Sequence, residues 1–179
     1  YTLNFEAPEI VLNYSPLISS RRNPLVKRLR GLATKKGREE NSLLLIEGTN
    51  LFKESLQAGF IPKEIFATST WMQSNSELLK ILPSKTVFFE VTLSVLEASL
   101  TTISPDGVAC LVSIEELPKP IGNPSFVLAL DRLQDPGNLG TLMRTALAGE
   151  VDEVWLASGA DPLAPKVIRA SAGAVFHLP

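Results

Sequence analysis

The chain has few of the residues that disulfides, metal sites and thiol enzymes require. Its 179 residues include one cysteine and one histidine. A single cysteine excludes an internal disulfide, and together the two residues do not supply the ligands of a structural zinc site. Cys110 lies in the apolar run "GVACLVS", which favours a small buried side chain over a nucleophile. We therefore expect neither a metal site nor cysteine chemistry.

Long apolar runs and a targeting segment are also missing. No run approaches the roughly 18 apolar residues that are needed to cross a bilayer. The first twenty residues hold Glu6 and Glu9 but no basic residue, unlike a signal or transit peptide. A composition of 45% apolar and 20% charged residues is typical of globular proteins. We expect no membrane association and a cytoplasmic location, with an organelle as the alternative.

Acidic residues are absent from one stretch near the N-terminus. Residues 21–38, "RRNPLVKRLRGLATKKGR", hold eight basic side chains although the whole chain has a net charge of −2. Asn23 as N-cap, Pro24 at the first helical position and leucines on one side predict a basic amphipathic helix within residues 19–40. Such a block is expected to meet a polyanion, and the alternative is a solvated helix that covers the next domain. The predicted RNA-binding residues are Arg21, Arg22, Lys27, Arg28, Arg30, Lys35, Lys36 and Arg38.

The rest of the chain alternates between strand and helix patterns. Residues 41–113 predict a small α/β domain, preceded by an extension at residues 1–18. The acidic residues of this domain, such as Glu47 and Glu54, are interpreted as members of the solvent-exposed polar faces of ordinary helices. Residues 114–125, with three prolines and a glycine, predict a stiff linker.

A second domain is expected at residues 126–179. "FVLAL" has the continuous apolar character of a parallel strand that is buried on both faces, and "EVWLA" resembles it after one helix. The turn between them, "DPGNLG", matches neither familiar phosphate-binding pattern, which disfavours a small-molecule nucleotide-binding domain. Asn138 and Arg144 follow this turn. Asn138 is either a functional side chain or a simple N-cap, and Arg144 is either functional or paired with an acid such as Glu150.

Two stretches of this second domain resemble a known family. "NLGTLMRTA" with "GEVDEVWL", and then "PKVIRASAGAVFHLP", are similar to the first and second motifs of the SpoU-type branch of the SPOUT RNA methyltransferases. Upstream, "LLLIEGTNLFKESLQAG" through "SPDGVACLVS" resembles the small RNA substrate-binding domain that precedes many members. The motif-two candidates are Lys166, Arg169, Ser171 and Gly173.

The resemblance implies a fold and an activity. The fold is α/β, with a small N-terminal substrate-binding domain linked to a parallel-sheet methyltransferase domain of trefoil-knot type. The activity is transfer of a methyl group from S-adenosylmethionine to a ribose 2′-hydroxyl of ribosomal or transfer RNA. Asn138 and Arg144 match the catalytic positions of motif one. Arginine is a poor general base because its pKa exceeds about 12, so we expect Arg144 to act as a bidentate clamp that Asn138 orients.

One part of the family pattern has no counterpart. The third motif, which forms much of the knot and the cofactor pocket, is missing from the chain, so we expect a fragment that is truncated before the knot. No cofactor-binding residue is assigned, and the chain is expected to bind S-adenosylmethionine poorly and to be inactive by itself. The full-length protein is expected to form a homodimer. The alternative function is a non-catalytic RNA-binding module of the same lineage.

Overall fold

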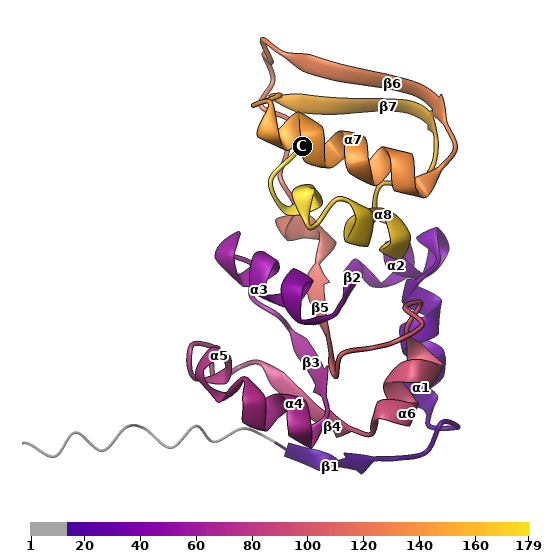
Figure 1. Ribbon diagram of the computed structural model, residues 1–179, viewed down its shortest axis with the longest axis vertical. Helices are drawn as coiled ribbons and strands as arrows, with labels where there is room; N and C mark the ends of the chain where they lie inside the picture. The colour runs from indigo at the N-terminus through magenta and orange to yellow at the C-terminus, as the bar shows by residue number, and fades with distance from the viewer. Residues whose placement is uncertain (1–13) are drawn as a thin grey trace, which may run out of the picture.

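The structure is a computed structural model that describes residues 14–179. Its strands are β1 (Tyr14–Ile18), β2 (Leu43–Glu47), β3 (Glu64–Ala67), β4 (Val87–Val91), β5 (Val108–Ser113), β6 (Val127–Leu133) and β7 (Glu153–Gly159). Its helices are α1 (Pro24–Leu32), α2 (Lys35–Asn41), α3 (Thr49–Gln57), α4 (Ser69–Ser74), α5 (Ser76–Lys80), α6 (Leu93–Ser99), α7 (Pro136–Ala148) and α8 (Pro165–Ala170). Figure 1 shows an elongated molecule with β6, β7 and α7 at one end and β1 and β4 at the other.

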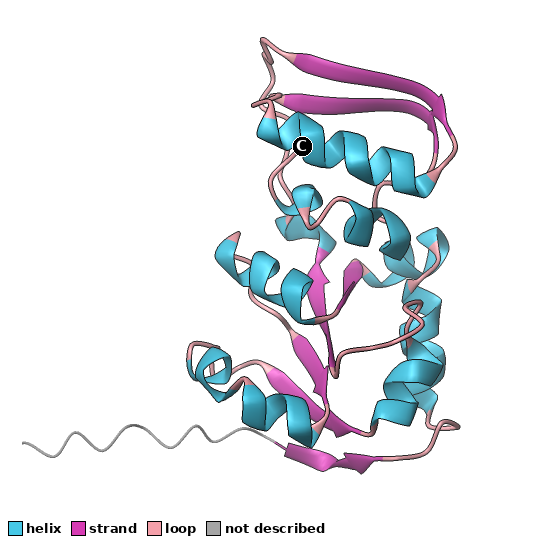
Figure 2. Ribbon diagram, viewed as in Figure 1, coloured by secondary structure: helices cyan, strands magenta, loops and turns pink. Residues whose placement is uncertain are grey.

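A five-stranded sheet organises residues 14–113. Its order is β1-β4-β3-β5-β2, and β1, β4 and β3 are parallel while β5 is antiparallel to both neighbours. Helices cover both faces (Figure 2). Side chains alternate along each strand, so Leu44 and Ile46 of β2 pack with Phe52 of α3, while Leu45 packs with Leu29 of α1. The predicted α/β class is confirmed.

The N-terminal part of this region differs from the expectation in two respects. Residues 14–18, expected in an extension, form the edge strand β1 beside β4. The basic segment forms two helices, because the hydroxyl of Thr34 accepts a hydrogen bond from the Gly37 backbone N–H at 3.1 Å and starts α2. The start of α1 is as expected, with the Asn23 side chain accepting from the Leu25 N–H at 2.9 Å and Pro24 following it. The basic side chains therefore occupy two helices.

The lone cysteine lies in the interior of the sheet. Cys110 on β5 is fully buried, and burial raises the pKa of its thiol far above the usual range. The interpretation as a small buried side chain is confirmed.

The second sheet consists of the parallel strands β6 and β7, joined through α7. Within residues 14–179, "FVLAL" is covered on one face only, not on both faces as expected. Leu128 and Leu130 pack against the core beneath α7, whereas Ala129 and Asp131 point to the opposite, exposed face. Trp155 of β7 is 55% exposed on that face. Within residues 14–179, helices cover only one side of this sheet.

One hydrophobic core runs through both parts of the molecule. It contains Phe52 and Ile65 from the first part together with Met143 and Ile168 from the second. The predicted linker is tied to the second part, because the Ile121 N–H donates to Glu153 at 2.9 Å and the Ser125 N–H to Asp152 at 2.7 Å. The two parts share this core, so the structure does not test the predicted domain boundaries. These boundaries stay a prediction. No helix of the described residues is long and apolar enough to cross a membrane.

Candidate catalytic and RNA-binding site

An aspartate that follows the turn after β6 is the N-cap of α7. Asp135 accepts a hydrogen bond from the Asn138 N–H at 2.7 Å, and Pro136 occupies the first helical position. The alternative that Asn138 is the N-cap is therefore wrong. Its side chain lies in the first turn of α7 and is exposed, so it is accessible to a ligand.

Asn138 and Arg144 lie on different sides of α7. Six residues of regular helix separate two positions by about 9 Å along the axis and about 120° around it. No hydrogen bond joins the two side chains in the described structure, and no acid pairs with Arg144, neither Glu150 nor another among residues 14–179. The geometry gives no support to the prediction that Asn138 orients Arg144. Their catalytic roles stay predictions.

The motif-one helix packs directly on the motif-two helix. Gly140 of α7 is buried, and a Cβ at this position would lie 2.5 Å from the Ala170 Cβ and 2.8 Å from the Ser171 nitrogen. Only glycine allows this approach of α7 to α8. Arg144 follows one turn later, within about 40° of Gly140 around the helix. Arg144 therefore lies at the rim of the contact between the two predicted motifs and remains exposed.

Three of the motif-two candidates have structural contacts. Ser171 is buried and its hydroxyl donates to the Ile168 carbonyl at 3.0 Å. Gly173 adopts φ +85°, and a Cβ there would lie 2.7 Å from the Glu54 Cγ. Arg169 donates to Glu47 at 2.6 Å and to the Thr101 hydroxyl at 2.7 Å. Lys166 alone of the four is exposed without a carboxylate partner among the described residues.

Glu47 is the acceptor that joins the two parts of the molecule. Its carboxylate is 1% exposed and also accepts from the backbone N–H groups of Thr101 and Thr102 at 2.9 and 3.0 Å. An ion pair of Arg38 with Asp161 and a hydrogen bond between the side chains of His177 and Glu54 cross the same interface. The interpretation of Glu47 and Glu54 as ordinary polar faces is wrong. An acid at the end of the apolar run "LLLI" was the available sequence signal for Glu47.

The predicted RNA-binding residues divide into four groups. Arg38 is 2% exposed and donates to the Leu32 and Ala33 carbonyls, so it is a structural residue and is removed from the RNA-binding set. Arg28 donates a bidentate hydrogen bond to Glu64, with both N···O distances at 2.6 Å, and this interaction raises the pKa of Arg28. The Nζ atoms of Lys35 and Lys36 lie 3.8 and 3.7 Å from carboxylate oxygens one helical turn later. Arg21, Arg22, Lys27 and Arg30 are exposed and pair with no acid among the described residues.

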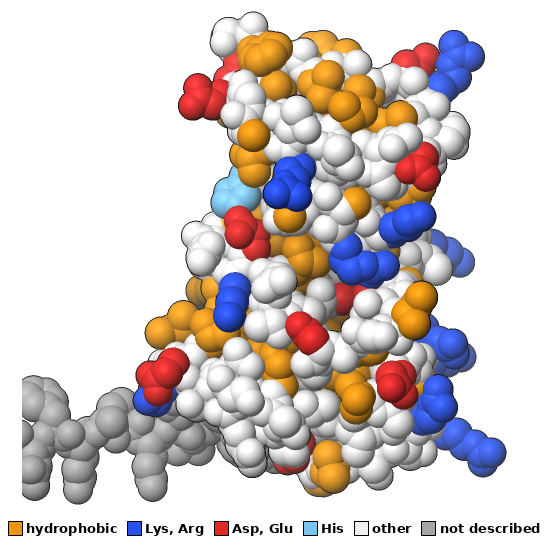
Figure 3. Space-filling model, viewed as in Figure 1, with side chains coloured by type: hydrophobic (Ala, Val, Ile, Leu, Met, Phe, Trp, Pro, Cys, Tyr) orange, Lys and Arg blue, Asp and Glu red, His pale blue; other side chains and the backbone are white. Residues whose placement is uncertain are grey.

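The cationic side chains gather on one side of the molecule. Figure 3 shows Lys and Arg side chains along the edge that carries α1 and α2. The buried residues Leu25, Val26, Leu29 and Leu32 anchor α1, so its opposite face points to solvent. This face is preformed for contact with a polyanion.

Three hollows on the described surface have volumes of about 670, 360 and 240 Å³. None of these three includes Asn138, Arg144, Lys166 or Arg169 among its lining residues. No group of His, Cys, Asp or Glu side chains suited to a metal ion occurs in residues 14–179.

Two family models match the chain side by side. Residues 23–110 match the MRM3-like substrate binding domain, and residues 125–179 match the SpoU rRNA methylase family. An uncharacterized tRNA/rRNA methyltransferase of Synechocystis is 41% identical over 90% of the chain and 60% of the relative. Residues 125–179 thus match the SpoU rRNA methylase family, and an MRM3-like substrate binding domain precedes them.

Other SpoU relatives agree in sequence and fold. The 23S rRNA (guanosine(2553)-2′-O)-methyltransferase RlmP of Bacillus subtilis is 33% identical over 90% of this chain and 63% of that protein. The crystal structure of an AdoMet-bound rRNA methyltransferase from Sinorhizobium meliloti is 29% identical, with a TM-score of 0.75 over 93% of this chain and 63% of that one. The chain thus spans about three fifths of the length of these SpoU proteins. The predicted family resemblance and the α/β methyltransferase fold are confirmed, and truncation before the knot stays a prediction.

Proposed function

We propose that the protein to which this chain belongs transfers a methyl group from S-adenosylmethionine to a ribose 2′-hydroxyl of ribosomal or transfer RNA. The two matching family models, in the order substrate-binding domain then methylase, support the proposal. The names of the relatives support a ribose of RNA as the acceptor. The observation that carries it is the placement of Arg144, exposed and without an acid among the described residues, at the rim where α7 meets α8.

The chemistry assigns Arg144 an electrostatic role. A ribose hydroxyl is a weak nucleophile and must lose its proton close to the moment of attack. An arginine with a pKa above about 12 does not accept that proton, but its planar guanidinium binds a phosphate or a developing alkoxide through two N–H groups. Asn138, exposed on another side of the same helix, contributes a separate polar contact rather than a hydrogen bond to Arg144. The group that accepts the proton is left unassigned.

The three hollows described above are not lined by Arg144. Bound S-adenosylmethionine supplies an electrophilic methyl group, and the AdoMet-bound relative from Sinorhizobium meliloti supports this donor. None of the three hollows reaches Arg144, however. We therefore assign no cofactor-binding residue and derive no step through the donor.

RNA is the substrate class that best fits the exposed cations of α1 and the preceding turn. Arg21, Arg22, Lys27 and Arg30 present positive charge on one side of a chain whose net charge is −2. These four residues, with Lys35 and Lys36 at the margin, form the proposed phosphate-binding set. A homodimer and a cytoplasmic or organellar location are further proposals for the full-length protein, and sedimentation and fractionation test them.

The full-length protein should be incubated with labelled S-adenosylmethionine and with separated ribosomal and transfer RNA fractions. The expected product is one RNA that carries label on a ribose 2′-oxygen, mapped by resistance of the adjacent phosphodiester bond to alkaline cleavage. RNA binding without incorporation of label into any fraction supports the alternative, a non-catalytic RNA-binding module. Label on a base instead of a ribose contradicts the proposed reaction.

A further inference from the structure

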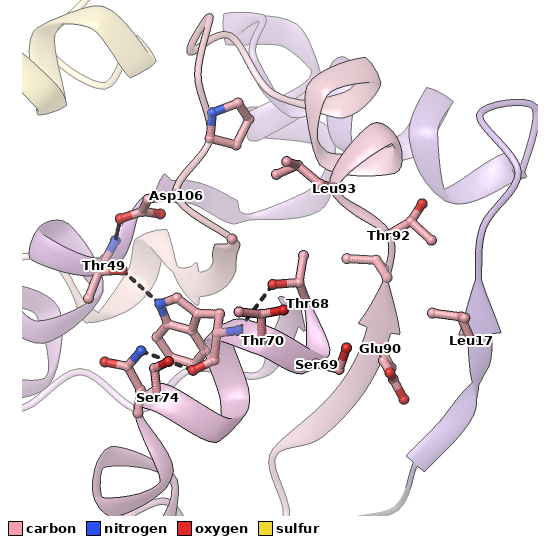
Figure 4. Close-up of a pocket in the computed structure, with 15 residues that line it drawn as sticks. Leu17, Thr49, Thr68, Ser69, Thr70, Ser74, Glu90, Thr92, Leu93 and Asp106 are labelled. Atoms are coloured by element: carbon pink, nitrogen blue, oxygen red, sulfur yellow. Dashed lines mark hydrogen bonds between the residues drawn. The ribbon is translucent and has the colours of Figure 1, made fainter.

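The substrate-binding part contains a polar hollow of about 670 Å³ (Figure 4). It lies where the parallel strands β3 and β4 end, beside Leu17 of β1. Its volume falls in the roughly 300–1,000 Å³ range of small-molecule sites. Figure 1 places these strand ends at the end of the molecule opposite α7. The hollow is therefore separate from the Arg144 region.

Hydrogen bonds fix the walls of this hollow. The Trp71 indole N–H donates to the Thr49 hydroxyl at 2.7 Å, and the Thr49 backbone N–H donates to one oxygen of Asp106 at 2.8 Å. Gly107 adopts φ +108°, and a Cβ at this position would lie 2.9 Å from the Thr68 hydroxyl. The loop that carries Asp106 is thus held against α3 and α4, which gives a preformed site.

The lining has a distinctive balance of charge. It contains the carboxylates Glu90 and Asp106 but no Lys, Arg or His. Hydroxyl groups supply most of its other polar atoms, from Thr49, Thr68, Ser69, Thr70, Ser74 and Thr92. Such a site repels a phosphate and attracts a group that presents N–H donors. Its chemistry is the opposite of that of the cationic face of α1.

The carboxylates retain capacity to accept hydrogen bonds. Glu90 is partly buried and accepts none from a described residue, and the second oxygen of Asp106 accepts none either. Leu17 and Leu93 are 54% and 46% exposed at the rim and offer apolar surface to a flat ring. A ligand that satisfies both features is planar and carries adjacent N–H donors along one edge.

We propose that this hollow binds an unpaired guanine base of the RNA substrate. Guanine presents its N1–H and N2–H groups side by side, which matches the two oxygens of a carboxylate, while uracil offers a single N–H and cytosine and adenine a single amino group. Unstacked bases of single-stranded RNA are commonly recognised through such edges and through contact with their faces. The inference rests on the proposed RNA substrate and adds a base preference to it. Phosphates on either side of the base remain outside the hollow, in reach of solvent.

The test uses the full-length protein and three labelled ten-nucleotide RNAs. The first is all uridine, the second has one central guanine, and the third has inosine in its place, which lacks the 2-amino group. Fluorescence anisotropy at constant salt should show that the guanine RNA binds roughly tenfold more tightly than the uridine RNA, with the inosine RNA between them. Equal affinity for all three RNAs overturns the proposal.

Two variants locate the preference. Asp106→Asn keeps an acceptor for the Thr49 N–H, and Glu90→Gln keeps side-chain size, so both should fold while losing most of the guanine preference. Glu97→Gln changes an exposed acid of α6 outside the hollow and should retain the preference. A preference unchanged in both hollow variants overturns the proposal.

Other outcomes separate this inference from the function on which it rests. If ribose methylation proceeds normally without any guanine preference, only the base-binding hollow is overturned. If no RNA binds at all, both are overturned. If guanosine monophosphate binds as tightly as the guanine RNA, the hollow takes a free nucleotide and the assignment to RNA fails.

Discussion

The two sheets of the described residues are covered by helices to different extents. The five-stranded sheet of residues 14–113 has helices on both faces, and its inner strand β5 is buried along its whole length. The pair β6 and β7 packs against α7 on one face only, and its other face exposes Trp155 and Asp131. The first part holds two hydrophobic clusters, whereas the second contributes to a cluster that it shares with the first.

The difference shows where each kind of residue acts. Apolar side chains of the five-stranded sheet stabilise the fold, while the second part depends on its neighbour for packing, for the ion pairs of Arg169 and Asp161 and for the hydrogen bond of His177. The residues proposed to meet RNA, Arg144 and the exposed cations of α1, lie outside both clusters. Stability and function are therefore separable by mutation.

The largest effect on stability should come from the core of the five-stranded sheet. Phe66 is fully buried and stacks on Phe89 at 5.1 Å, so Phe66→Ala should lower the free energy of unfolding by about 3–5 kcal/mol. Phe126→Ala, at a side chain that is 55% exposed beside β6, should lower it by less than about 1 kcal/mol. Urea denaturation of the 179-residue chain measures both. Should Phe66→Ala not fold, Phe66→Leu provides the smaller cavity, and equal losses at Phe66 and Phe126 would contradict the comparison.

The next largest effect concerns catalysis. In the full-length enzyme, Arg144→Ala should lower kcat for methyl transfer about 100- to 1,000-fold, because it removes a preorganised charge, and should leave the Kd for RNA within about twofold. Arg132→Ala is the matched control, since Arg132 is also exposed in the second part and, among residues 14–179, pairs only with its neighbour Asp131 at 3.1 Å. An Arg144→Ala enzyme that retains most of its activity would refute the clamp.

The interface between the two parts should show a smaller cost. Arg169→Met leaves the buried Glu47 carboxylate without its cation and should destabilise the chain by about 2–3 kcal/mol. The double variant with Glu47→Gln should recover part of this loss, and a double-mutant cycle measures the coupling. Lys80→Met breaks an exposed pair with Glu77 and should cost less than about 1 kcal/mol. A coupling near zero between Arg169 and Glu47 would mean that the pair does not hold the interface.

RNA affinity should depend on α1 and the preceding turn rather than on total charge. Replacing Arg21, Arg22, Lys27 and Arg30 with Ala should weaken RNA binding and reduce the log–log salt slope by about 0.7 for each phosphate that is no longer neutralised. Folding should be unaffected, because all four side chains are exposed. The control removes four other exposed cations, Lys63, Lys80, Lys85 and Lys119. Equal changes of slope in the two variants would show that the location of the charge is irrelevant.

The smallest effect is expected at the start of the second sheet. Asp152 accepts hydrogen bonds from the Phe126 N–H and from the hydroxyl and N–H of Ser125, and these lower its pKa below the ordinary 3.8. Its contribution to stability is thus fully present above the ordinary pKa and is lost as the pH falls through the lowered one. Asp152→Asn should flatten the acid limb of the stability curve slightly, only below about pH 4. NMR titration of Asp152 checks the direction of the shift, and a raised pKa would contradict it.

Local patterns in the sequence predicted much of this molecule. The alternation of strand and helix in residues 41–113 and the cap at Asn23 depend on side chains a few residues apart, and the structure contains them. The edge strand β1 was missed, because its pairing with β4 spans more than seventy residues and leaves no local signal. The exposed face of β6 was missed for a related reason, since an apolar strand does not reveal how many of its faces are covered.

The sequence by itself determined the α/β class, the family resemblance and the basic block, and it predicted the motif positions of Asn138 and Arg144. Only the tertiary structure decided how those residues are used. Arg38 and Arg169 have the same charge as Arg30 and Arg144, yet the fold brings Asp161 and Glu47 to the first two and leaves the others exposed. The partners of Arg38 and Arg169 lie more than a hundred residues away in the chain. Charge is a property of the residue, but its neutralisation depends on contacts between distant segments, which form only when the two parts pack together.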